Sequence, residues 1–156
     1  MKPSTLFFLS ICVLNVLSCQ ELTGERELDS DERFQIANDE TFIAYKKVVA
    51  ESGMYIALNR YDLEAIHNVR KSYPNARRMR QIPEQAYAGI RGGILYRDIR
   101  IRLDSLIDEV QRKFQFFTLP EEERREINRI YSTGIGAQIE NEIREKVFHY
   151  HQSKEQ

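Results

Sequence analysis

Few side chains in this 156-residue sequence have the types and spacing that catalysis or metal binding requires. Glu64 and His67 have the Glu-x-x-His spacing, which places both on one helix face and can serve one iron of a di-iron site in a helical bundle. That site needs a second such pair, which the sequence lacks. His149 and His151 are two residues apart and would point to different sides of a helix. We therefore expect no metal ligands and no cofactor.

Signals for covalent and phosphate chemistry are also missing. The sequence has no Gly-x-Ser-x-Gly elbow, and its glycine pair Gly92-Gly93 matches neither a phosphate-binding loop nor a dinucleotide fingerprint. The paired carboxylates, such as Glu121-Glu122-Glu123, are typical of solvated helix faces. We expect a non-enzymatic protein. An enzyme or a metal-binding helical bundle that uses buried Glu and His is the alternative.

The amino-terminal segment has the pattern of an export signal. Lys2 is followed by an apolar run over residues 6–17, which is too short for a hydrocarbon core of ~30 Å that needs roughly 20 helical residues. Such a run is typical of a signal peptide, and polar, acid-rich sequence follows it directly. We expect residues 1–18 to be removed.

The end of this segment, Val16-Leu17-Ser18-Cys19, resembles the lipobox of bacterial lipoproteins. In that family an aliphatic residue stands three before the cysteine and a small residue directly before it. The resemblance implies diacylglycerol transfer to the Cys19 thiol, cleavage after Ser18 and acylation of the new amino terminus. The alternatives are an ordinary signal peptide, giving a secreted structural or ligand-binding protein without lipid, and an uncleaved anchor.

Two further observations bear on the anchor. The sequence contains two cysteines, and Cys12 would leave with the leader, so the folded part has none for a disulfide. By the same family resemblance, an aspartate after the cysteine would imply retention at the inner membrane. The residue there is Gln20, so we expect a lipid-anchored protein of the cell envelope, on the outer membrane.

Positive charge is concentrated in the middle of a chain whose net charge is −1. Residues 52–102 hold ten basic and four acidic residues, whereas residues 20–51 hold four and nine. Arginine forks suit phosphates and carboxylates, so a patch for an anionic envelope component or an acidic protein is one interpretation, and pairing within the chain is the other. The net charge favours no nucleic acid. The candidate patch comprises Arg77, Arg78, Arg80, Arg91 and Arg97.

Helices must position these groups, because the sequence has only four prolines and seven glycines and no strand pattern. Apolar residues at three- and four-residue spacing predict an all-α antiparallel bundle of about four helices. Gly53, Asn59, Pro83 and the capping box from Thr118 mark its predicted boundaries, and Gly134 and Gly136 predict a kink. The predicted helices cover residues 30–52, 59–72, 83–117 and 118–150.

The predicted domain organisation follows from these segments. A signal peptide occupies residues 1–18, and a lipidated amino terminus with a flexible acidic tether covers 19–31. The helical domain extends over 32–151, and a polar tail over 152–156. The sequence therefore predicts a membrane-anchored envelope lipoprotein that binds another envelope component, as a binding protein or an accessory subunit of a complex.

Overall fold

A computed structural model describes residues 26–152, and within this range the chain forms helices and turns without a strand. This confirms the all-α class that the periodicity predicts. The α-helices are α2 (Ser30–Asn38), α3 (Glu40–Ala57), α4 (Leu63–Ser72), α5 (Gly93–Phe114), α6 (Glu121–Tyr131) and α7 (Ala137–Gln152). Short 3₁₀ helices are η1 (Met79–Gln81), η2 (Glu84–Tyr87) and η3 (Phe116–Thr118), and η4 (Ser132–Gly136) is π-helical.

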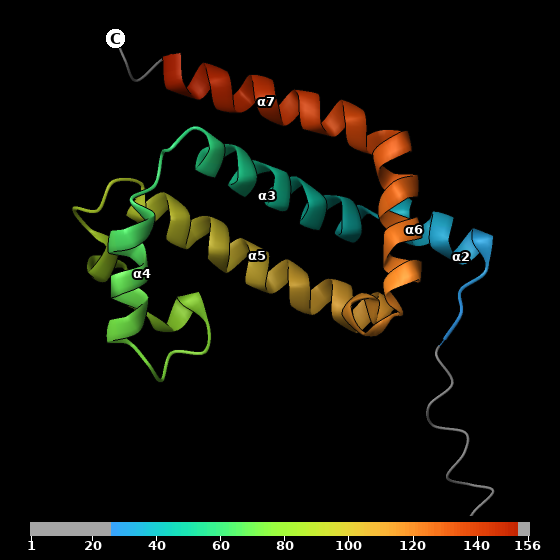
Figure 1. Cartoon of the computed structure of the whole chain (residues 1–156), viewed down its shortest axis with the longest axis horizontal. Coiled ribbons are helices and arrows are strands. Elements are labelled where there is room, and N and C mark those ends of the chain that lie inside the picture. The colour runs from blue at the N-terminus through green and yellow to red at the C-terminus, as the bar shows by residue number, and fades with distance from the viewer. Residues whose placement is uncertain (1–25, 153–156) are drawn as a thin grey trace, which may run out of the picture.

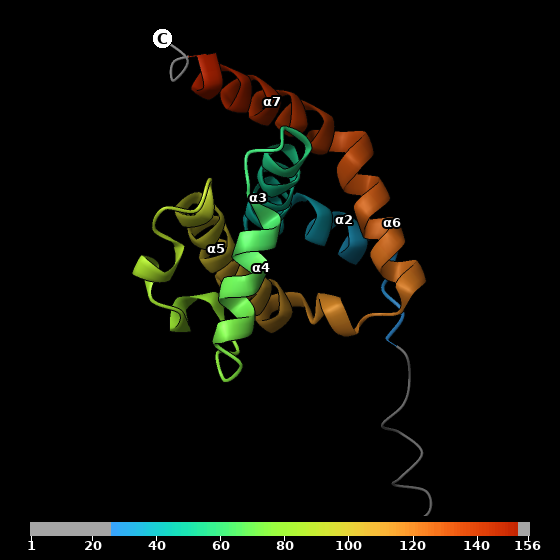
Figure 2. The same cartoon turned by 60° about the vertical axis from the view of Figure 1, so that its left-hand side comes forward.

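Helix α3 is the centre of the arrangement and packs against both α5 and α7. Figure 1 shows α5 and α7 on opposite sides of α3, with α5 antiparallel to it and α7 running in the same direction as α3. The direction of α7 follows from α6, which crosses the end of this layer from α5 to α7 (Figures 1 and 2). Helix α2 packs on α6, and α4 lies near η2 at the other end.

Two of the predicted helices are each divided into two. Residues 30–57 form α2 and α3 with a break at Asp39, whose carboxylate accepts a hydrogen bond from the backbone N–H of Thr41 at 2.9 Å and so caps α3. Helix α2 begins with a capping box, in which Asp29 and Glu32 each accept from the other's backbone N–H.

The second division, between α6 and α7, confirms the kink predicted from the glycines. The backbone leaves helical geometry at Gly134, with φ −97° and ψ −120°. A Cβ on Gly136 would lie 2.7 Å from both the ring and the carbonyl oxygen of Tyr131, so the close approach at this bend requires glycine.

Four predicted boundaries need correction. Gly53 does not end its helix, because α3 continues to Ala57 with Tyr55 buried in the core. Asn59 is not a cap: it adopts φ 51° just after α3, and α4 is capped by Asp62. Pro83 begins only the short η2. The hydroxyl of Thr118 donates to the carbonyl of Gln115 at 2.7 Å, so it does not cap α6.

The core consists of two clusters that meet along α3. One contains the rings of Phe42, Phe116 and Tyr131, with Phe42 5.1 Å from Phe116 and 6.0 Å from Tyr131 between centroids. The other gathers α4, the 3₁₀ turns and the first half of α5 around Tyr87 and Ile99. Tyr45 and Ile143 contact both clusters, so the packing is continuous from one end to the other.

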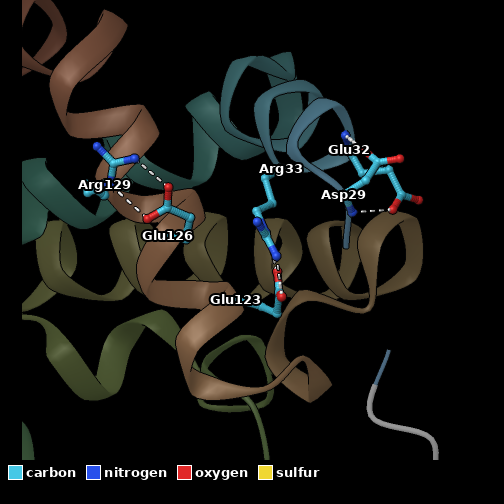
Figure 3. A network of polar contacts seen from close by, with 6 residues as sticks. All are labelled: Asp29, Glu32, Arg33, Glu123, Glu126 and Arg129. Carbon is cyan, nitrogen blue, oxygen red and sulfur yellow. Dashed lines mark hydrogen bonds and ion pairs between the residues drawn. The ribbon is translucent and has the colours of Figure 1, made fainter. Parts of the chain in front are cut away.

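An ion pair between half-buried Arg33 and buried Glu123 joins α2 to α6. Figure 3 shows Arg33 and Glu123 pointing toward each other from these two helices. The guanidinium donates twice to the carboxylate, at 2.6 Å and 2.7 Å. Leu28, just before α2, is buried in the core. The packed structure therefore reaches into the stretch predicted as a tether.

Candidate functional site

A cleft of about 680 Å³ lies between α3, α5 and α7. Helix α3 supplies its floor through Ala44 and Val48, one turn apart on the same helix face. Helices α5 and α7 supply opposite walls, in keeping with their places on either side of α3 in Figure 1. Its volume is within the range of small-molecule sites, ≈ 300–1,000 Å³. The apolar lining is aliphatic: Ala44, Val48, Ile101, Leu106, Ile143 and Val147.

The same periodicity that builds the core leaves the cleft open. Val48 and Val147 are 7% and 2% exposed and belong to the core, whereas Ala44, Leu106 and Ile143 are only partly buried. A small residue at position 44 leaves room between the flanking helices that a larger side chain would fill. Buried core residues and their partly buried neighbours therefore line the cleft together.

Charged side chains stand around this aliphatic lining. Arg102 on α5 donates to Glu51 on α3 at 3.1 Å, with the arginine 52% and the glutamate 18% exposed. Lys47 is exposed on α3, and among the described side chains no carboxylate lies within ion-pair distance of it. Glu142 on α7 accepts from the side-chain amide of Gln138 at 2.9 Å.

The cleft has one hydroxyl-bearing residue among the side chains that line it. Ser105 is the hydroxyl-bearing residue of the lining, and its Oγ donates to the carbonyl of Ile101 at 3.1 Å. No histidine or cysteine is among the lining residues, and the carboxylates of the lining belong to Glu51 and Glu142. An aliphatic lining with a few polar groups at its edge is typical of a ligand site.

A cluster of tyrosines packs near the charged edge of the cleft. The ring of Tyr61 lies 5.9 Å from that of Tyr55 and 5.3 Å from that of Tyr96. The Tyr61 hydroxyl is buried without a hydrogen-bond partner among the described residues. Burial raises the pKa of this hydroxyl, and the neighbouring Tyr55 and Glu51 raise it further. The hydroxyl is therefore neutral at physiological pH and offers no catalytic base.

A second polar group lies on another face of α3. Lys46 donates to the amide oxygen of Asn128 at 3.1 Å, and its Nζ lies 5.4 Å from the ring centre of Tyr131. Burial lowers the pKa of the Lys46 amine. Its contacts join α3 to α6, and it is not among the residues that line the cleft, so we assign Lys46 a structural part.

The residues that the sequence singled out for metal chemistry do not converge. Glu64 and His67 are both exposed on α4. Among the side chains that the structure describes, there is no group of three His, Cys, Asp or Glu placed to hold a metal ion. His149 and His151 lie in α7, but their side chains are outside the described part of the structure.

The arginines of the candidate patch are distributed over three places. Arg78 forms a two-pronged ion pair with Asp108, and Arg80 lies beside it. Arg97 donates to the carbonyl of Ile82 and lies near Glu84 and Asp98. It is about three helical turns of α5 away from Asp108, the partner of Arg78. Arg91 donates to the carbonyl of Asn59 at 2.8 Å. Arg77 is exposed. These contacts favour pairing within the chain for three of the five arginines.

The predicted lipidation residue, Cys19, lies outside the described residues, as does the whole leader. None of the helices in the described range is long and apolar enough to cross a membrane. Compared with protein-family models, curated proteins and solved structures, the chain has no significant match.

The cleft was not predicted from the sequence. Its six aliphatic lining residues are ordinary helix positions on three helices that are far apart in the sequence. No pattern in the sequence indicates that these positions, such as Ala44 on α3, line a common cleft.

Proposed function

We propose that this chain is a lipid-anchored, non-enzymatic binding protein of the bacterial cell envelope, acting alone or as an accessory subunit of an envelope complex. The observation that carries the binding part is the aliphatic cleft between α3, α5 and α7, in which the Ser105 hydroxyl donates to a backbone carbonyl of its own helix. The anchoring part is supported by the sequence Val16-Leu17-Ser18-Cys19 and its resemblance to a lipobox.

The physics of the anchor supports durable membrane attachment. Each buried methylene adds about 0.8 kcal/mol of membrane affinity, and a single acyl chain gives only marginal binding. The two or three chains that lipoprotein processing attaches to Cys19 would hold the domain at the membrane without a spanning helix. Gln20 after the cysteine favours the outer membrane in this proposal.

Fractionation of bacterial cells that express the chain tests the anchor. We expect the wild-type protein in the membrane pellet after a high-salt wash, because acyl chains resist salt whereas surface ion pairs are screened. The Cys19→Ala variant should lose this membrane attachment. A matched Cys12→Ala variant removes the other cysteine and should behave as wild type. If Cys19→Ala, with residues 1–18 removed, remained in the washed pellet to the same extent as wild type, lipid anchoring through Cys19 would be wrong.

A further inference from the structure

We propose that the cleft between α3, α5 and α7 binds a long-chain fatty acid, with its aliphatic chain in the cleft and its carboxylate beside Lys47 and Arg102. This inference rests on the proposed binding function and names its ligand class. It depends on the lining of the cleft and on the signs of the charges around it.

The lining selects an aliphatic chain. Six of the eleven lining residues are aliphatic, and none is aromatic. Flat ring systems are commonly held by aromatic faces, which this cleft lacks. Hydrogen-bonding groups for a polar ligand are also scarce between the walls, since the Ser105 hydroxyl is occupied by the Ile101 carbonyl. A flexible apolar chain needs none of these partners.

The charges at the edge select an anionic end group. On α3 and α5 the charged lining residues are Lys47, Glu51 and Arg102, which together carry one net positive charge. Glu51 is held by Arg102, yet a guanidinium has five N–H donors and keeps others for a ligand. Lys47 lies one helical turn from Glu51, with no carboxylate of the described side chains paired to it.

The remaining lining charge, Glu142, stands on α7 and opposes an anion. Its carboxylate accepts from Gln138, one turn nearer the start of α7. Lys47 is one turn after the Ala44 floor position on α3, which runs in the same direction as α7. In this proposal the carboxylate lies at the end of the cleft where Arg102 pairs with Glu51 and where Lys47 lies one turn before Glu51.

Titration of the full-length chain carrying Cys19→Ala tests this assignment, because that variant has no acyl chain of its own to fill the cleft. Calorimetry below the critical micelle concentration compares four ligands with one common chain: a fatty acid, a fatty alcohol, an alkyl trimethylammonium and a lysophospholipid. We expect the fatty acid to bind one per chain and tightest. Lengthening short chains should tighten binding about fourfold per methylene until the cleft is full.

Two variants distinguish the cleft from other apolar surface. Ser105→Trp fills the cleft from an exposed position of α5 and should weaken fatty-acid binding at least about tenfold. Arg144→Trp places the same side chain on an exposed position of α7 outside the lining and should bind as the parent does. Equal circular dichroism of the two variants verifies that both are folded.

Lys47→Gln tests the end group. This substitution should weaken the binding of the fatty acid about two- to fivefold, as expected for the loss of an exposed charge pair. The affinity for the fatty alcohol should not change. Glu142→Gln removes the negative charge that opposes the carboxylate. It should strengthen the binding of the fatty acid or leave it unchanged.

Several results would overturn the inference. They are the absence of saturable binding, equal binding of acid and alcohol, or binding that Ser105→Trp does not change. A lysophospholipid that binds at least tenfold tighter than the acid would make a membrane lipid the ligand instead. If no amphiphile binds but Ser105→Trp abolishes a crosslink to an envelope protein, the cleft docks a protein. In that case the proposed binding function stands and the fatty-acid assignment is wrong. The Cys19→Ala fractionation is independent of all these results.

Discussion

At the scale of single residues, the ion pair between Arg33 and Glu123 has the clearest energetic role. Glu123 is the charged residue that the described fold buries, and an uncompensated charge there would be costly. Two hydrogen bonds from Arg33 compensate it. The pair therefore fixes α2 on α6, the point at which the chain from the membrane would enter the domain.

We predict that Glu123→Gln lowers the melting temperature by several degrees at pH 7, because the amide cannot accept both guanidinium bonds. Glu122→Gln, at an exposed neighbouring position, is the matched control and should change it by about a degree or less. Differential scanning calorimetry of both variants measures this. Equal melting temperatures for Glu123→Gln and wild type would show that the pair adds no stability.

The same substitution has a defined pH dependence. The hydrogen bonds from Arg33 lower the pKa of Glu123 below the ordinary value of a glutamate. A lowered pKa in the folded state means that Glu123 stabilises the fold above the unfolded-state pKa, about 4.3, and loses this effect as pH falls through the folded pKa. The difference between wild type and Glu123→Gln should be constant from pH 7 to about pH 5 and shrink below about pH 4. A difference that grew in acid would contradict this.

Unlike the Glu123 carboxylate, the Tyr61 hydroxyl is a buried polar group without a hydrogen-bond partner among the described residues. Removing the hydroxyl with Tyr61→Phe should raise the free energy of unfolding by about 1 kcal/mol, because an unsatisfied buried group destabilises the fold. In the control Tyr87→Phe, the lost hydroxyl lies 3.1 Å from the sulfur of Met79, so no gain is expected. Urea unfolding compares the two. Destabilisation by Tyr61→Phe would show that its hydroxyl has a partner in solution.

At the scale of elements, the sequence predicted helical content better than helix ends. Apolar periodicity located all four helical regions, since the buried faces of α3, α5 and α6 are long stripes. The helix ends were harder to predict because tertiary contacts determine where each helix stops. Gly53 remains inside α3 because Tyr55 anchors the last turn in the core, and Thr118 turns its hydroxyl to the Gln115 carbonyl instead of capping α6.

Two glycines, one before α5 and one inside α3, should respond oppositely to alanine. Gly92 has φ +70°, and a Cβ there would lie 2.2 Å from the Arg60 carbonyl oxygen, so Gly92→Ala should destabilise by about 2 kcal/mol or more. Gly53 lies in α3 with open space around it, so Gly53→Ala should stabilise by about 1 kcal/mol. Midpoints of urea unfolding give both values. A tolerated Gly92→Ala would mean that the loop before α5 has another conformation.

At the scale of the whole molecule, the candidate site could not be predicted from the sequence. The cleft exists because α7, turned back at the Gly134–Gly136 bend, lies on the side of α3 away from α5. No local pattern specifies that placement. The arginine patch is a different case, because the sequence does concentrate positive charge in its middle. In the folded chain, however, Arg78, Arg91 and Arg97 lie beside separate partners.

The proposed role at the membrane depends most on the covalent state of the processed amino terminus. Intact mass spectrometry of the protein, extracted from the membranes of a lipoprotein-processing bacterium, measures this state directly. We predict a chain that begins at Cys19 and carries the added mass of a diacylglyceryl group, with or without a further acyl chain. A chain that begins at Cys19 or nearby without added lipid mass, or one that retains residues 1–18, would contradict lipid anchoring.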